Sequence, residues 1–136
     1  MRFETQEDLD REKKAIERFV SLFKGSYKKL GPDDIDYKVF DSSGNLISYI
    51  EVKGRMSLIK DAFPLCISAY KLSRLANKRL NPVLIWACLD GIIYTKIKEC
   101  EGTVRWGGRK PRAGSFSDEE LMVYYTNQKS FRYLKY

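Results

Sequence analysis

The first part of the chain has the hydrophobic spacing of an amphipathic helix. Thr5 and Asp8 stand three residues apart, which is the spacing of a capping box at a helix start. Apolar residues then recur on one face with a period of about 3.6 residues, namely Leu9, Ile16, Phe19, Val20 and Phe23. Gly25 is a residue type that commonly follows a helix end. We therefore expect a helix over residues 5–24.

Alternating apolar and polar positions predict a β-hairpin after this helix. A short strand is expected over residues 26–30, before the break at Gly31-Pro32. Residues 34–40 then alternate, the segment DSSGN forms a turn, and residues 46–54 alternate again. Two alternating runs joined by a short segment rich in Ser, Gly and Asn are typical of a hairpin.

A second helix and two further strands are expected in the middle of the chain. A loop containing Pro64 leads into a helical segment over residues 68–80, which Asn81-Pro82 ends. Residues 83–89 are continuously apolar and predict a buried strand, and residues 92–98 predict the strand that follows it.

The composition changes in the last third of the chain. Residues 101–117 are basic and rich in glycine, so we expect a loop there. Residues 121–127 predict a late strand, and residues 130–136 predict a short terminal element. Because no internal repeat or linker divides the chain, we expect one domain over residues 1–136, with its core at about 5–98.

The charge balance favours a polyanionic partner. Lys and Arg number 25 against 18 acidic residues, and the formal net charge is +7. A basic balance of this kind favours nucleic acid first and an anionic membrane second. The absence of histidine excludes a Ser-His-Asp triad, a Cys-His pair and a histidine-based nuclease site. Any catalysis therefore has to use carboxylates, lysine, tyrosine, cysteine or a metal ion.

The cysteines and the start of the chain predict a soluble, intracellular protein. Cys66, Cys88 and Cys100 are odd in number and widely spaced, unlike a disulfide framework or a zinc site. No apolar run approaches the roughly 20 residues that a membrane-spanning helix needs. The segment 1–4 does not have the character of a signal peptide. We therefore expect free thiols and a cytoplasmic location.

The predicted hairpin places two carboxylates on one face. If the turn is centred on Ser43-Gly44, Asp36 lies directly opposite Glu51. Opposed side chains have Cβ atoms about 5 Å apart, so two like charges would repel unless a cation lay between them. Carboxylate oxygens suit hard cations such as Mg²⁺ or Mn²⁺. Lys53 projects from the same face, one pleat further along. The alternative is an exposed hairpin face with cross-strand ion pairs.

Glu12 is a further carboxylate in an unusual position. It falls within the apolar stripe of the first helix, between the directions of Ile16 and Phe19. A carboxylate that faces a core is costly unless it is paired or bound to a metal. The alternative is an ion-paired glutamate at the edge of the stripe.

These residues and the order of the elements resemble the PD-(D/E)XK nuclease superfamily. The motif D-(x14)-E-V-K runs from Asp36 to Lys53, after a helix that bears Glu12 and before a second helix. The resemblance covers the chain from about residue 5 to about residue 98. It implies an α/β fold with a restriction-endonuclease-like αβββαβ core, in which helices flank a central mixed sheet.

The resemblance also implies a metal site for Mg²⁺ or Mn²⁺. Asp36 and Glu51 would be the carboxylate ligands, and the main-chain carbonyl of Val52 would be a further ligand. Glu12 resembles the glutamate of the first helix that completes the acidic cluster in many members. Asp34 points to the same face as Asp36 and is the rival for its role.

The resemblance also extends to two lysines. Lys53 would orient or activate the attacking water, or stabilise the charge that develops on the phosphate. Lys71, near the start of the second helix, resembles the Lys or Gln often found there. The alternative for Lys71 is an ordinary solvated lysine on a helix.

The tail segment GGRKPR…SDEE…VYY resembles part of small phage-type nuclease-like proteins. Its two glycines let a backbone approach a phosphate, and its basic residues supply charge. Trp106 could stack on a base. The candidate nucleic-acid-binding residues are Arg55, Trp106, Arg109, Lys110 and Arg112. The alternative is a basic loop without this role.

Together these features predict a metal-dependent nuclease that hydrolyses phosphodiester bonds in DNA. Two carboxylates, a carbonyl group and a lysine provide a metal site and positive charge without histidine. The resemblance suggests a phage-encoded protein that acts in a bacterial host, and a homodimer would present two sites to two strands. The alternatives are an enzyme that resolves Holliday junctions or other branched DNA, a nucleic-acid-binding module of the same fold without activity, and a domain that binds an acidic ligand or a protein.

Overall fold

The computed structural model describes residues 5–31, 35–107 and 119–136. Its helices are α1 (Gln6–Val20) and α2 (Ala69–Ala76), with two 3-10 turns, η1 (Ser21–Phe23) and η2 (Ile59–Asp61). Its strands are β1 (Ser26–Lys29), β2 (Tyr37–Phe40), β3 (Leu46–Gly54), β4 (Leu65–Ser68), β5 (Val83–Ala87), β6 (Gly91–Lys96), β7 (Thr103–Gly107), β8 (Glu120–Tyr125) and β9 (Arg132–Lys135). None of the described helices is long and apolar enough to cross a membrane.

The larger of two sheets has the strand order β1-β2-β3-β5-β6-β9. It is mixed, because β3 and β5 are parallel whereas the other neighbours are antiparallel. The hairpin of β2 and β3 has the predicted register, with Tyr37 opposite Ile50 and Lys38 opposite Tyr49. The element order confirms the predicted αβββαβ core, with β4 added between β3 and α2.

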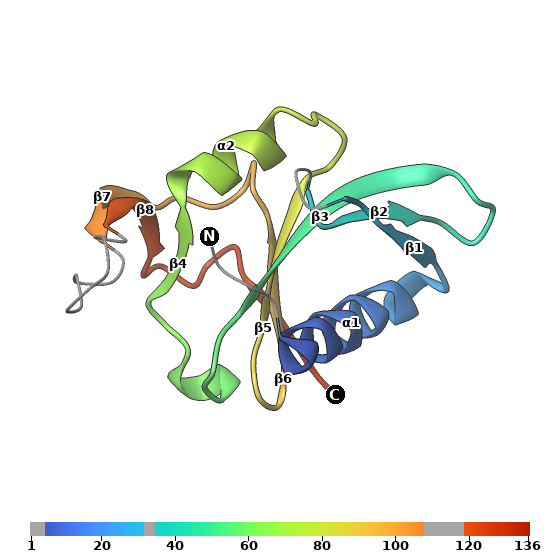
Figure 1. Cartoon of the computed structure of the whole chain (residues 1–136), viewed down its shortest axis with the longest axis horizontal. Helices are drawn as coiled ribbons and strands as arrows, with labels where there is room; N and C mark the ends of the chain where they lie inside the picture. The colour runs from blue at the N-terminus through green and yellow to red at the C-terminus, as the bar shows by residue number, and fades with distance from the viewer. Residues whose placement is uncertain (1–4, 32–34, 108–118) are drawn as a thin grey trace.

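Helix α1 covers one face of the large sheet, as Figure 1 shows beside β5 and β6. The predicted capping box is present, since the Thr5 side chain accepts a hydrogen bond from the Asp8 N–H and the Asp8 side chain accepts one from the Thr5 N–H. Its apolar stripe packs on alternate residues of the strands. This cluster contains Ala15, Ile16, Phe19, Val20, Tyr37, Val39, Ile50, Val83, Ile85, Ala87 and Ile92.

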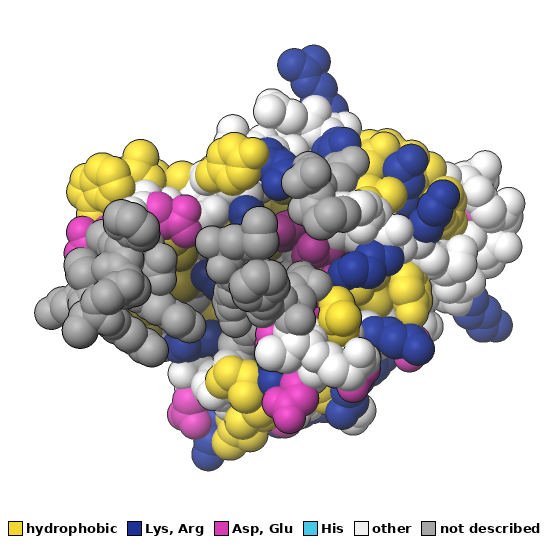
Figure 2. Space-filling view, in the orientation of Figure 1, with side chains coloured by type: hydrophobic (Ala, Val, Ile, Leu, Met, Phe, Trp, Pro, Cys, Tyr) yellow, Lys and Arg dark blue, Asp and Glu magenta, His cyan; other side chains and the backbone are white. Residues whose placement is uncertain are grey.

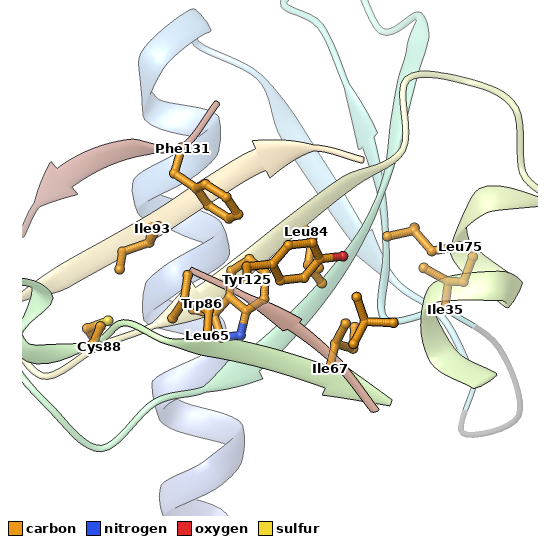
Figure 3. Close-up of a cluster of buried hydrophobic side chains, with 12 residues drawn as sticks. Ile35, Leu65, Ile67, Leu75, Leu84, Trp86, Cys88, Ile93, Tyr125 and Phe131 are labelled. Atoms are coloured by element: carbon orange, nitrogen blue, oxygen red, sulfur yellow. The ribbon is translucent and has the colours of Figure 1, made fainter. Parts of the chain in front are cut away.

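The opposite face of the large sheet is covered by α2 and by a small sheet of order β4-β8-β7. Trp86 of β5 is fully buried there, and its ring meets the rings of Tyr125 and Phe131 (Figure 3). The Trp86 indole N–H donates a 3.0 Å hydrogen bond to the Cys66 carbonyl oxygen. Burial of a large aromatic ring with its one donor satisfied ties the small sheet firmly to the large one.

The structure corrects three of the expected elements. Residues 103–107 form β7, not a loop, because they pair with β8 from much later in the chain. Strand β4 was not expected, and it too exists by pairing with β8. The second helix ends at Ala76 rather than near residue 80, because Arg79 and Asn81 take positive φ angles that no α-helix contains. Local periodicity did not reveal these partners.

The three cysteines are free, as predicted. Cys88 is buried, whereas Cys66 and Cys100 are partly exposed.

Candidate active site at the ends of β3 and β5

Asp36 and Glu51 are held side by side by the hairpin backbone. Glu51 lies in β3 and is 8% exposed, and Asp36 directly precedes β2. The Asp36 N–H donates a 3.3 Å hydrogen bond to Glu51 Oε2, and the Val52 N–H donates a 2.8 Å bond to Asp36 Oδ2. Each carboxylate is therefore oriented by the strand that carries the other, as the predicted register requires.

Burial and mutual repulsion disfavour the charged forms of this pair. Burial, followed by the charges of Glu51 and Glu12, raises the pKa of Asp36 to about 7. Burial also raises the pKa of Glu51, while the charges of Lys71 and Arg74 act in the opposite direction. Two crowded carboxylates of this kind are stabilised by protons or by a cation between them.

Glu12 approaches the pair from α1. Its charge raises the pKa values of both Asp36 and Glu51, and its side chain is buried. Glu12 Oε1 also accepts a 2.7 Å hydrogen bond from Lys29 Nζ. Glu12 is thus ion-paired, as the alternative interpretation expected, and its charge acts on the other two acids. Its part in a metal site stays a prediction. The sequence did not point to Lys29, because its contact with Glu12 depends on how α1 packs against β1.

A pocket of about 410 Å³ opens next to this site; Glu12 lines it, whereas Asp36 and Glu51 do not. It lies where the parallel strands β3 and β5 end, and α1 and α2 contribute to its walls. The carboxyl ends of parallel strands are a common location for ligand sites in α/β proteins. The described lining residues are Asp8, Arg11, Glu12, Val52, Lys53, Gly54, Met56, Lys71 and Ala87. In the space-filling view, acidic side chains near the middle of the face have Lys and Arg side chains around them (Figure 2).

Lys53 and Lys71 both reach this pocket. Lys53 Nζ donates to Cys66 Sγ at 3.4 Å, a contact that joins β3 to β4. Lys71 stands in the first turn of α2, which the Ser68 hydroxyl caps by accepting from the Lys71 N–H at 3.1 Å. Arg74 also acts on Glu51 and was not predicted, although its position three residues after Lys71 places it on the same helical face.

The donor set fits a hard divalent cation held by two carboxylates. Within the described ranges, no three Asp, Glu, Cys or His side chains form a group that could hold a metal ion. The Asp36 and Glu51 oxygens would therefore be completed by the Val52 carbonyl and by water, which is the usual coordination of Mg²⁺ in proteins. The crowding of the two acids is the structural feature that such a cation would relieve.

The other candidates for nucleic-acid contact lie apart from the pocket lining. Trp106 is 70% exposed on β7, at the edge of the small sheet. Arg55 Nε donates a 2.9 Å hydrogen bond to the Ala62 carbonyl oxygen, so its guanidinium is partly committed to the fold. The remaining candidates, Arg109, Lys110 and Arg112, lie outside the described residues, as does Asp34, the rival of Asp36.

Comparison with known families identifies a nuclease family. A family model described as "Phage putative PDDEXK endonuclease" matches residues 1–134. The match includes both strands of the hairpin, both helices and the small sheet. The comparisons with curated proteins and with solved structures found no match.

Proposed function

Because the chain belongs to this family of phage PDDEXK endonucleases, we propose that it is a metal-dependent endonuclease that hydrolyses phosphodiester bonds in DNA. Membership of the family supports nuclease activity in general. The dependence on a metal ion and the choice of DNA as substrate are our proposal. The observation that supports them is the crowded Asp36–Glu51 pair close to a pocket that Lys53 and Lys71 line. The net charge of +7 favours a nucleic-acid substrate.

The residues of the site would have different roles in phosphodiester hydrolysis. Asp36, Glu51 and the Val52 carbonyl would hold Mg²⁺ or Mn²⁺. When bound, such an ion supplies a water of lowered pKa and positive charge for the phosphate. Glu12, which lies near both acids, adds negative charge to the metal site. The Lys29 ion pair keeps Glu12 in place.

The two lysines act on the substrate side of the pocket. Lys53 can donate hydrogen bonds to the attacking water or to a phosphate oxygen, because its ammonium group reaches the pocket from the strand that carries Glu51. Lys71 enters from α2 and lowers the pKa of Glu51 against the effect of burial. Positive charge placed where negative charge develops in the transition state is a strong source of rate enhancement.

Cleavage of a substrate panel tests this function. Duplex, single-stranded, flapped and four-way DNA and RNA would be incubated with Mg²⁺ or Mn²⁺, or with EDTA. We expect cleavage of at least one DNA substrate that depends on the metal and falls by about 100-fold or more in Glu51→Gln. Glu101→Gln, a change of the same kind at an exposed acid, is the control and should cleave normally.

The panel also separates the alternatives. A preference for four-way or flapped DNA would identify a branched-DNA enzyme, and cleavage of RNA alone would replace the DNA assignment. Cleavage in EDTA, or full activity of Glu51→Gln, would contradict the proposed metal-dependent mechanism.

A further inference from the structure

A row of basic side chains crosses the hairpin near the carboxylate pair. Lys28 of β1 lies directly opposite Lys38 of β2, and Lys38 lies directly opposite Tyr49 of β3. Lys78 Nζ lies 5.1 Å from the centre of the Tyr49 ring. We refer to Lys28, Lys38 and Lys78 as the hairpin lysine cluster. None of these three residues belongs to the site described above.

The hairpin lysine cluster faces the same side of the sheet as the active-site acids. Lys38 follows Asp36 by two residues, and Tyr49 precedes Glu51 by two, so their side chains share one face. Helix α2 lies over this face, because Lys71 and Arg74 act on Glu51 and Lys78 follows the helix directly. In the space-filling view, Lys and Arg side chains gather where β1 and β2 lie (Figure 2).

The contacts of the described residues do not explain the charges of Lys28 and Lys38. Like charges directly opposite each other on antiparallel strands destabilise a sheet. In the described part of the chain, neither Lys28 nor Lys38 has an acidic partner within ion-pair distance. Lys29, the neighbour of Lys28 on the opposite face, instead pairs with Glu12 at 2.7 Å. The sequence thus pairs the lysine that faces α1 and leaves two opposed lysines on the active-site face.

We propose that the hairpin lysine cluster binds the phosphate backbone of the DNA substrate on one side of the cleaved bond. Two residues of strand span about 7 Å. Lys38 would therefore meet a phosphate close to the one at Asp36 and Glu51, and Lys28 and Lys78 would meet its neighbours. This inference rests on the proposed function for the identity of the substrate.

Binding of a labelled DNA duplex in EDTA tests the cluster without cleavage. The variant Lys28→Gln/Lys38→Gln removes two charges and keeps side chains of similar length. The control, Lys60→Gln/Lys129→Gln, removes two charges from exposed lysines outside the cluster. We expect the cluster variant to bind about 10-fold more weakly in moderate salt, with the slope of log affinity against log salt reduced by about two. The control should bind like the wild type.

Folding of the variants is checked by thermal melting. We expect the cluster variant to melt at or above the temperature of the wild type, because a like-charge contact is removed. Lys28→Gln alone, at an exposed position, provides a milder variant that should show a smaller loss of binding and a slope reduced by about one. Equal binding by the cluster variant and the control, or no measurable binding by the wild type, would overturn the inference.

The two proposals can fail separately. Loss of binding in the cluster variant together with no cleavage by the wild type on any substrate would leave the cluster standing and remove the nuclease mechanism. Metal-dependent cleavage by the wild type together with normal binding by the cluster variant would support the nuclease mechanism and remove the role of the cluster.

Discussion

At the scale of single residues, Glu51 and Lys53 occupy alternate positions of β3, and Lys53 lines the pocket next to the acids. Glu51 turns toward Asp36, and the ammonium group of Lys53 lies between Cys66 and the pocket. A strand that ends on charged residues is costly unless those residues are partnered. The Asp36 backbone N–H, which donates to Glu51 Oε2, and the Cys66 sulfur atom, which accepts from Lys53 Nζ, provide these partners.

Lys53→Ala separates catalysis from binding. We expect cleavage to fall by about 100-fold or more, because a positive charge next to the reacting phosphate is lost. Duplex binding in EDTA should stay near that of the wild type, since one lysine supplies a small share of the phosphate contacts. Lys60→Ala, at an exposed position outside the pocket lining, is the control for cleavage and binding. Cleavage retained by Lys53→Ala would remove the catalytic role given to this residue.

The sequence predicted the acids better than their cations. Asp36 and Glu51 could be paired in advance, because the turn fixes the register of a hairpin. The contacts of Lys29 with Glu12 and of Arg74 with Glu51 depend on how helices pack on the sheet, which no local pattern gives. Glu12 itself was visible as a polar residue within an apolar stripe.

At the scale of elements, the parts predicted correctly are those that local signals define. The capping box located α1, and alternation located β2 and β3. Strands β4 and β7 were missed because both exist through pairing with β8, which lies far from them in sequence. Composition misled at β7, where glycine and basic residues suggested a loop.

Gly91→Ala tests the packing of β9 on the large sheet. A Cβ at Gly91 would lie within the contact distance of the Leu134 carbonyl oxygen and 2.8 Å from Lys135 Cα. Backbone atoms cannot move aside as a flexible side chain can, so we expect a loss of stability of about 1–3 kcal/mol. Chemical denaturation measures this loss.

Gly31→Ala is the matched control for that change. A Cβ at Gly31 meets no atom of the described residues within 4 Å, so the free energy of unfolding of this variant should stay near the wild-type value. Equal stability of the two variants would contradict the close approach of β9 to β6.

At the scale of the whole molecule, the elements that cover the two faces of the large sheet both contribute residues to the site at the ends of β3 and β5. Helix α1 brings Glu12 from one face, while α2 and β4 bring Lys71 and Cys66 from the other. The hairpin lysine cluster extends the same face away from the pocket, toward the free edge at β1. A nucleic-acid strand that crossed this face would pass from the cluster to the acids. A homodimer, which would serve two strands, stays a prediction.

The most direct measurement is a calorimetric titration of Mn²⁺ into the protein in the absence of substrate. If Asp36 and Glu51 jointly hold the cation, the wild type and Glu101→Gln will bind Mn²⁺, and both Asp36→Asn and Glu51→Gln will lose about 10-fold or more in affinity. Equal Mn²⁺ binding by all four proteins would show that the metal is held elsewhere and would contradict the assignment of the site.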